Sequence, residues 1–196
     1  MKSSTAVLYL GFIVLGIIFA LSFSQQKSLP NNSGATVLVT PTPVAVSSSD
    51  SKVLGIQTKT IDCVAVNGLP DSACTPGAIF PGVTKDQVCQ SGYSASLRSV
   101  SAKTKDAVYK EYGIISHPEG TYEVDHLVSL ELGGSNDIAN LWPESADPRP
   151  GFHEKDVVEN YLHNKVCRGT MSLEEAQRQI STNWVSVYQQ IQAANY

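Results

Sequence analysis

The sequence predicts a mixed α+β fold in which a disulfide-stapled N-terminal portion precedes a short pair of strands and two flanking helices. Three observations predict it. All four cysteines lie beyond residue 52, a segment over 121–132 partly alternates polar and apolar residues, and apolar residues recur at steps of three and four between 157 and 191. Alternation is typical of strands and the longer step of helices.

The N-terminal segment predicts export. Lys2 precedes an uncharged apolar run over 6–23, which is the layout of a secretory signal peptide, although 18 apolar residues also approach the roughly 20 that span a bilayer. Residues 1–24 are therefore a signal peptide or a membrane anchor. Either alternative places the rest of the chain outside the cytoplasm, secreted or tethered to the outer face of the cytoplasmic membrane. Any membrane contact is expected through this segment alone.

Residues 25–52 are rich in Ser, Thr, Pro and Asn and show no sustained period, which predicts a disordered tether. The predicted folded domain is residues 53–196. It holds an even number of cysteines, and in an exported domain this predicts two disulfides among three possible pairings. Zinc is the less favoured alternative, since no CxxC pair is present. The disulfide candidates are Cys63, Cys74, Cys89 and Cys167.

The first part of the domain, residues 53–98, has turn signals every few positions and predicts an irregular segment with short strands. A helix is expected over 103–112, where Gly113 would end it in a left-handed conformation. Residues 121–132 then suit a strand or a hairpin arm. A glycine-rich loop over 133–137 follows.

The remaining elements are a second strand and two helices. Residues 140–143 predict a short strand that Pro143 ends. The first helix shows an apolar stripe formed by Val157, Val158, Tyr161, Leu162 and Val166. The second begins at Ser172, which with Glu175 makes a capping box, and its apolar stripe runs to Ile191.

The charge balance limits the partners. The chain has a net charge of −4, and residues 53–196 hold 11 basic and 17 acidic groups. A net-acidic domain is poorly suited to gripping nucleic acid through bulk charge, because phosphate neutralisation needs clustered Lys and Arg. An enzyme that holds phosphates through a metal ion is still compatible with this composition.

Chemistry-bearing residues gather in the window 117–163, which contains all four histidines and many carboxylates. This pattern suits metal-assisted phosphodiester hydrolysis, which needs carboxylate or imidazole ligands from two elements and a separate imidazole to accept a proton from water. Asp125 and His126 are adjacent, so on a regular strand their side chains would face opposite ways. A bulge or turn at this point is therefore expected.

The stretch VDHLVSLELGGSNDIANLWPE resembles the HNH (ββα-metal) endonuclease motif, and the chain is most similar to a group of exported bacterial HNH-type proteins. The resemblance extends through LPDSACTPG, VCQSGY, EKDVVENYLHNKVC and AQRQISTNW, and it covers roughly residues 66–188. It implies a ββα-metal core and a nuclease site. The zinc-knuckle cysteine pairs of many HNH domains are missing here, and disulfides are expected in their place.

By position, the resemblance implies that Asp125 is a metal ligand, that His126 is the general base and that Asn140 orients this base. The ligand expected at the start of the helix falls near His153, which could instead be an exposed helix-start residue. Lys155, Asp156 and Glu159 compete for the same position. Further residues are possible contributors. Glu159 and His163 could act from the helix, although His163 could also be a partly buried helix residue, and Arg98 could contact a phosphate or form a surface salt bridge.

The predicted function is metal-dependent phosphodiester hydrolysis of nucleic acid by a water that His126 activates, with DNA favoured over RNA as the substrate. One divalent ion is expected, Mg²⁺, Mn²⁺ or Zn²⁺. The alternative is a non-catalytic HNH-like module that binds or supports a partner outside the cytoplasm. A structural zinc site formed by Asp125, His153 and His163 is a less favoured third reading. The oligomeric state is not predicted.

Overall fold

The computed structural model describes residues 54–194, which all fall within one of the two units of the chain, residues 47–196. The predicted signal peptide or anchor and the predicted tether lie outside the described residues. Within the described range, no helix has the length and apolar character needed to cross a membrane.

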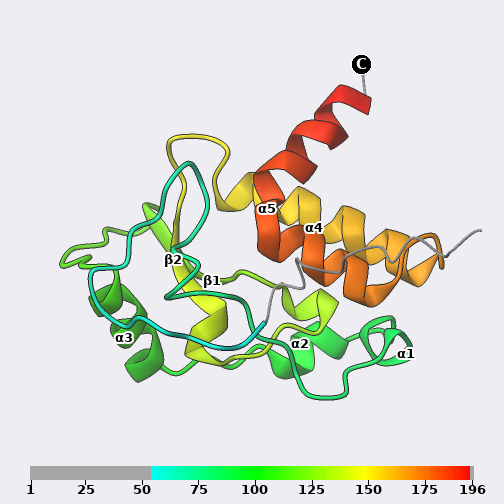
Figure 1. The fold of residues 1–196 in the computed structure, drawn as a ribbon, viewed down its shortest axis with the longest axis horizontal. Coiled ribbons are helices and arrows are strands. Elements are labelled where there is room, and N and C mark those ends of the chain that lie inside the picture. The colour runs from blue at the N-terminus through cyan, green and yellow to red at the C-terminus, as the bar shows by residue number, and fades with distance from the viewer. Residues whose placement is uncertain (1–53, 195–196) are drawn as a thin grey trace, which may run out of the picture. The chain divides into compact units, whose positions relative to one another are not determined.

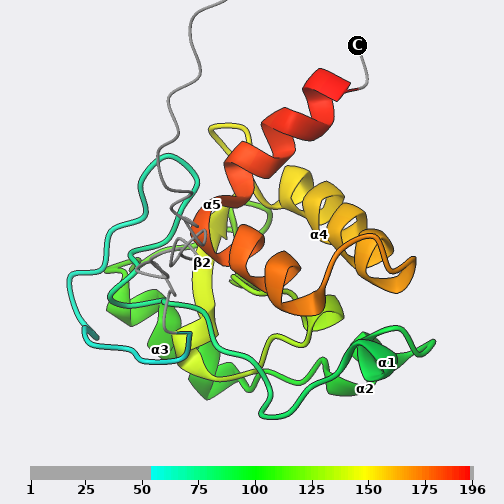
Figure 2. The same ribbon diagram turned by 45° about the vertical axis from the view of Figure 1, so that its right-hand side comes forward.

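The described residues form an α+β fold, as the sequence predicts. In both views of the ribbon, α3 lies on one side of the strands and α4 and α5 lie together on the other (Figures 1 and 2). The elements in chain order are α1 (Lys85–Val88), α2 (Tyr93–Leu97), α3 (Ala102–Glu111), β1 (Tyr122–His126), the 3-10 helices η1 (Leu130–Leu132) and η2 (Ile138–Asn140), β2 (Leu141–Ser145), α4 (Phe152–Cys167) and α5 (Leu173–Ala194).

Two disulfides form, and the protein has no free cysteine, which confirms the prediction from the cysteine count. Cys63 pairs with Cys74 inside the N-terminal portion. Cys89, at the end of α1, pairs with Cys167 at the end of α4. Disulfides persist where the surroundings are oxidising, so both bonds favour an extracytoplasmic location.

The short strands expected over 53–98 do not form. Among the described residues of this segment, only isolated bridges join Val66 to Leu69 and Ile79 to Gly134, and α1 and α2 form instead. The signal for α1 is a capping box, in which the Thr84 hydroxyl accepts from the backbone N–H of Gln87 while the Gln87 side chain accepts from that of Thr84. Each reciprocal bond satisfies a donor that a helix start would otherwise leave unpaired.

The strands β1 and β2 form a two-stranded antiparallel sheet, but β1 is shorter than predicted. The chain leaves the sheet after His126 and forms η1 over 130–132. The apolar side chains beyond His126 are all buried and do not alternate with exposed ones, so they suit a buried loop better than an edge strand. They are Leu127, Val128, Leu130 and Leu132.

The expectation that Pro143 ends the second strand is wrong, because β2 continues to Ser145. Backbone hydrogen bonds from Leu127 N–H to the Asn140 carbonyl and from Ala146 N–H to the Thr121 carbonyl flank the hairpin. Hydrogen-bonded and non-hydrogen-bonded pairs alternate in an antiparallel ladder, so the pair of Val124 and Pro143 falls at a non-hydrogen-bonded position. The ladder therefore needs no N–H from the proline.

The helices α4 and α5 bury one continuous apolar face. The α4 stripe is shifted from the predicted one, since Val157 and Tyr161 are exposed while Val158 lies in the core. The helix α5 bends at Asn183, whose φ of −164° and ψ of 81° are not helical, and the Asn183 side chain accepts from Ser186 N–H beyond the bend. The buried core of the two helices is Val158, Leu162, Val166, Ala176, Ile180, Trp184, Val187 and Ile191.

Candidate active site

His126 is the last residue of β1, and its half-buried ring turns toward the loop that follows. Its Nε2 lies 2.9 Å from the Asn136 side-chain oxygen, while the Asn136 amide nitrogen donates to the Leu97 carbonyl at 2.8 Å. A carbonyl can only accept, so the contact with Leu97 fixes which end of the Asn136 amide faces the ring. His126 Nε2 therefore carries a proton, and Nδ1 is left as the basic nitrogen.

The surroundings of His126 favour its neutral form. Burial lowers the pKa of the imidazole, and the positive charges of Lys155 and Arg98 act in the same direction. The hydrogen bond with Asn136 and the negative charge of Asp125 oppose this effect only in part. Together these effects lower the pKa of His126 below the ordinary histidine value. The ring is therefore neutral at neutral pH and can accept a proton.

Asn140, the predicted orienting residue, is fully buried and contacts backbone rather than the His126 ring. Its oxygen accepts from Val128 N–H at 2.9 Å and from Ala78 N–H at 3.3 Å. Its amide nitrogen donates to the Val128 and Ser135 carbonyls, each at 2.9 Å. Asn140 thus fixes the loop between the two strands, and any effect on His126 passes through this backbone.

Two glycines allow the same loop to close tightly. Gly133 has a φ of 78°, in the left-handed region that favours glycine. A Cβ on Gly134 would overlap the carbonyl oxygen of Val128. The loop therefore carries Asn136 at a fixed distance from His126, a contact that the sequence analysis missed because an asparagine after glycines is equally typical of an ordinary turn.

A buried lysine joins α4 to the sheet. Lys155 is fully buried, and its Nζ donates to Asp125 Oδ2 at 2.7 Å, to the His126 carbonyl at 2.8 Å and to Glu159. Glu144 Oε2 lies 4.0 Å from the same nitrogen. Burial disfavours the charge, but the three carboxylates outweigh it and raise the pKa of Lys155 above its ordinary value. The ammonium is therefore a permanent cation within this acidic cluster.

The carboxylates around Lys155 differ in protonation. Burial would raise the pKa of Asp125, but the charge of Lys155 and hydrogen bonds from Glu144 and Lys155 hold it below the ordinary value. Burial raises the pKa of Glu144 well above its usual range, and the charge of Asp125 adds to this effect. Neutral Glu144 can therefore act as a donor toward ionised Asp125, while neither buried Glu144 oxygen has a hydrogen-bond partner of ordinary geometry among the described residues.

Glu159 lies on α4 one turn after Lys155 and is also poorly ionised. Burial and the charges of Asp125 and Asp156 raise the pKa of Glu159 to about 7, against the opposing effect of Lys155. The sequence reasoning missed the role of Lys155, since a lysine among acidic helix residues is typical of a solvated face. The only sequence signal is its position one turn before the buried stripe of α4.

The bulge expected at Asp125 and His126 is absent. The pairing of β1 with β2 is unbroken, with Asp125 opposite Trp142 and His126 opposite Leu141. The two side chains follow the ordinary strand alternation, so Asp125 meets Lys155 of α4 while His126 meets Asn136 of the loop.

The start of α4 places exposed groups beside this cluster. His153 is exposed, and its ring lies 4.3 Å from that of Phe152. Asp156 is also exposed, and burial of its carboxyl together with the charge of Asp125 raises its pKa, against the charges of Lys155, His153 and Arg98. Arg98 follows α2 and is exposed, and it forms no salt bridge with a described residue.

Asp125, Asp156 and His153 offer carboxylate oxygens and an imidazole, which are ligand types for a divalent ion, but among the described residues their ligand atoms do not form a group within 4.8 Å of one another. Lys155 is the competing cation, because one Asp125 oxygen already accepts from it. His163 lies elsewhere, with its Nε2 3.0 Å from the Val88 carbonyl and 3.4 Å from Cys167 Sγ. The structure thus offers no support for the zinc reading that combined His163 with Asp125 and His153.

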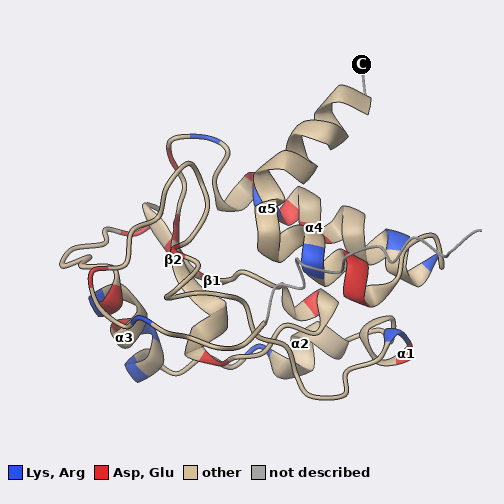
Figure 3. Cartoon of the chain, viewed as in Figure 1, with Lys and Arg blue, Asp and Glu red and all other residues tan. Residues whose placement is uncertain are grey.

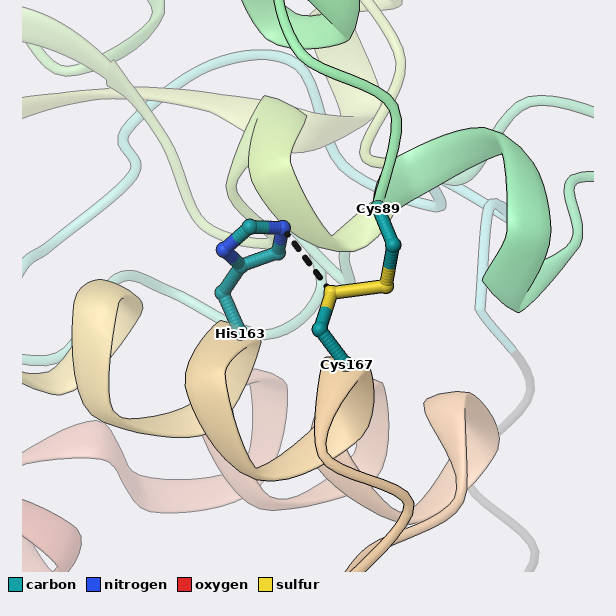
Figure 4. Close-up of side chains that lie close together, drawn as sticks. All are labelled: Cys89, His163 and Cys167. Atoms are coloured by element: carbon teal, nitrogen blue, oxygen red, sulfur yellow. Dashed lines mark hydrogen bonds between the residues drawn. A yellow bond between two sulfur atoms is a disulfide. The ribbon is translucent and has the colours of Figure 1, made fainter.

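A second group of potential ligands lies at the other end of α4. Cys89, His163 and Cys167 bring one nitrogen and two sulfur atoms within 4.8 Å of one another, so this group could hold a metal ion (Figure 4). In the structure the two sulfurs are bonded to each other. Disulfide sulfurs are not thiolates, which are the form that binds metals.

Basic residues are spread over the described fold. Lys and Arg segments occur on α1, α3 and α4 and in the loop before α4, without forming a single stripe (Figure 3). This arrangement agrees with the net-acidic composition of the domain.

Comparison with known proteins adds no relative. The chain matches no family model, no curated protein and no solved structure.

Proposed function

We propose that this domain hydrolyses phosphodiester bonds in nucleic acid, with His126 as the general base. The observation that carries the proposal is the hydrogen-bonded series from His126 to Asn136 and Leu97, which holds a neutral imidazole and leaves Nδ1 as its acceptor. The order of β1, β2 and α4 around this histidine agrees with the resemblance to HNH endonucleases.

In the proposed reaction, His126 Nδ1 takes a proton from water while the water oxygen attacks phosphorus. The bond from phosphorus to the leaving sugar oxygen breaks, and that oxygen takes a proton from solvent. His126 becomes an imidazolium, which Asn136 stabilises by accepting from Nε2–H, and the nearby charge of Asp125 favours it as well. Asn140 and the glycine turn keep the ring in place by fixing the loop.

Asp125, Asp156 and His153 would hold the divalent ion, Mg²⁺, Mn²⁺ or Zn²⁺, after their side chains draw closer together than they lie in the structure. When bound, the ion supplies positive charge next to the phosphate and the leaving oxygen. Lys155 fixes the Asp125 carboxylate against the sheet. Arg98, which is exposed and whose charge reaches both His126 and Asp156, would contact a phosphate.

We propose DNA rather than RNA as the substrate. Because the domain has few clustered cations, we expect few phosphate contacts and a shallow salt dependence of binding. The two disulfides support action outside the cytoplasm.

The test is nucleic acid cleavage by the parent and by His126→Ala in the presence of Mg²⁺, Mn²⁺ or Zn²⁺. Loss of the base should lower the rate by roughly two to four orders of magnitude, while circular dichroism stays unchanged. Asn140→Ala should lose less activity, because the base is still present although its loop is less well fixed.

The matched control is His117→Ala, an exposed histidine in the loop before β1. All variants are purified in parallel, to exclude a contaminating nuclease. Cleavage by His126→Ala at the parent rate would contradict the proposal.

A second candidate function is a non-catalytic module that binds a partner outside the cytoplasm. Lys155 favours it, since this residue already neutralises Asp125 without any metal ion. Thermal unfolding with added Mg²⁺, Mn²⁺ or Zn²⁺ separates the two functions. A rise in melting temperature that Asp125→Ala removes supports the metal-dependent enzyme, because a ligand that binds only the native state stabilises it. No cleavage and no metal response in the parent would favour the binding module.

A further inference from the structure

Three side chains converge where α1 meets the last turns of α4, away from the residues of the proposed nuclease site. His163 and Cys167 are four residues apart on α4, so their side chains lie on one face of the helix. Cys89 reaches them from the end of α1 (Figure 4). All three are partly exposed, and their ligand atoms lie within 4.8 Å of one another.

This arrangement is close to the spacing of a tetrahedral zinc centre. With Zn–S distances of about 2.3 Å and Zn–N of about 2.0 Å, a tetrahedral site separates a sulfur from a nitrogen by roughly 3.5 Å and two sulfurs by roughly 3.8 Å. His163 Nε2 already lies 3.4 Å from Cys167 Sγ. Only the two sulfurs, now joined in a disulfide, would have to separate.

We propose that the protein with this disulfide reduced binds one Zn²⁺ through Cys89, His163 and Cys167, so that the metal replaces the disulfide as the link between α1 and α4. A dithiol reductant supplies two electrons and two protons, the S–S bond breaks, two thiols form, and the reductant becomes a disulfide. Metal binding then releases the two thiol protons. Solvent provides the fourth ligand, since the three side chains are partly exposed.

The donor set selects the metal. Two thiolates and an imidazole suit Zn²⁺, whereas Mg²⁺ and Mn²⁺ prefer oxygen ligands. His163 Nε2 now donates to the Val88 carbonyl, so it must give up this proton and bond, and the proton moves to Nδ1. The exchange is a local change of tautomer. The other pair, Cys63 and Cys74, has no histidine in a metal-sized group with it among the described residues.

Cobalt provides a direct test, because Co²⁺ bound tetrahedrally to thiolates absorbs strongly in the visible and near-ultraviolet. Full-length protein is reduced, freed of reductant under anaerobic conditions and titrated with Co²⁺. We expect one equivalent to give tetrahedral absorption bands that Zn²⁺ then removes by displacement. The oxidised protein should give no thiolate bands. If the reduced parent gives none either, the proposal is overturned.

Matched variants assign the ligands. The double substitution Cys89→Ser with Cys167→Ser should abolish the bands, whereas Cys63→Ser with Cys74→Ser should keep them. His163→Ala should weaken binding at least tenfold or shift the bands, and His117→Ala, an exposed histidine in the loop before β1, should not. Bands that survive the loss of Cys89 and Cys167, or are indifferent to His163→Ala, would overturn the site.

Reduction could also unfold the protein, so circular dichroism is followed in the same titration. In that case we expect Zn²⁺ to restore the helical signal of the parent but not that of the Cys89 and Cys167 double variant. A parent that stays unfolded at saturating Zn²⁺ would contradict the proposal. None of these measurements depends on cleavage, so they stand apart from the nuclease test.

Discussion

The two ends of α4 are attached to the rest of the fold in different ways. The N-terminal end is held by buried charge, where Lys155 joins Asp125 of β1 and lies near Glu144 of β2. The C-terminal end is held covalently, through the disulfide between Cys167 and Cys89 of α1. One attachment therefore responds to pH and the other to redox conditions. The two ends of one helix therefore depend on different conditions for their attachment.

Both attachments lead to His126. From the charged end, Lys155 donates directly to the His126 carbonyl. From the covalent end, the disulfide fixes α1, and α2 follows a few residues later and ends at Leu97, whose carbonyl accepts from Asn136. The ring and the backbone of His126 are thus positioned by different parts of the chain.

Removal of Lys155 should have the largest effect. Lys155→Ala leaves ionised Asp125 and partly ionised Glu159 without their cation, and breaking one buried pair already costs about 3–5 kcal/mol. We expect a loss of about 5 kcal/mol in the free energy of unfolding, measured by urea denaturation. The control is Lys165→Ala on the same helix, whose ammonium lies over the Tyr161 ring near the surface.

Added Mg²⁺ or Mn²⁺ should recover part of the stability that Lys155→Ala loses, because a metal ion can then neutralise the cluster. If Lys155→Ala is as stable as the Lys165→Ala control, the charged attachment of α4 is not what holds this end of the helix.

Loss of the disulfide at the other end should come next. The Cys89–Cys167 bond spans a sequence separation of 78, and Cys63–Cys74 spans 11. The loop-entropy estimate gives about 4.5 kcal/mol for the longer loop and about 3 kcal/mol for the shorter. Double serine variants of each pair, compared by urea denaturation, should keep this order. Equal losses would show that α1 is already held to α4 by packing.

The sequence predicted the α+β class, the two disulfides and the helices α3, α4 and α5, because turn residues, cysteine count and apolar periodicity are local signals. Prediction from the sequence failed where burial and strand register decide the local structure. The alternation over 121–132 suggested one long strand, but the fold buries Leu127 and Val128 in a loop. Pro143 is expected to end a strand, yet it lies at a non-hydrogen-bonded position of the ladder, where no backbone N–H is needed.

The candidate site was only partly accessible from sequence. The motif drew attention to Asp125, His126 and Asn140, whose proposed roles stay predictions. Asn136 and Lys155 were missed, because nothing local distinguishes a turn asparagine or a helix lysine from a solvated one. The position of each depends on long-range contacts, with Leu97 for Asn136 and with both strands for Lys155. The proximity of His163 to Cys89 was also hidden, because it depends on the pairing of Cys89 with Cys167. Four cysteines allow three pairings, and the sequence does not choose among them.

The contact between Asn136 and His126 gives a smaller and sharper prediction. A carboxylate facing His126 Nε2–H stabilises the imidazolium, so Asn136→Asp should raise the pKa of His126 by about one unit. The rising limb of the activity against pH would then move to higher pH. In the parent this limb should lie below the ordinary imidazole pKa, because only the neutral ring accepts a proton and the fold lowers its pKa.

Asn136→Ala is the matched variant for this measurement. It removes a hydrogen bond that raises the pKa of His126, so the limb should move to lower pH, and the maximal rate should fall because either ring nitrogen can then carry the proton. NMR titration of the His126 ring provides the same values without cleavage. Identical titrations in all three proteins would show that Asn136 does not act on the ring.

The last expected effect concerns Glu144 and the pH dependence of the charged attachment. Its pKa is raised in the folded protein, so its contribution to stability is present below the ordinary glutamate pKa and is lost as pH rises toward the folded value. Within that window one raised carboxyl lowers the free energy of unfolding by at most about 1.4 kcal/mol per pH unit.

Glu144→Gln keeps the shape of the side chain and a donor for Asp125 but cannot ionise. Urea denaturation at about pH 5, 6 and 7 should therefore show a smaller decline in stability for Glu144→Gln than for the parent. Glu159 also has a raised pKa and is unchanged in this variant, so the decline should shrink but not vanish. Glu123→Gln, an exposed residue opposite Glu144 in the sheet, is the control and should decline as the parent does. If Glu144→Gln follows the parent at all three pH values, Glu144 is ionised in the folded protein and Lys155 balances one more charge than inferred.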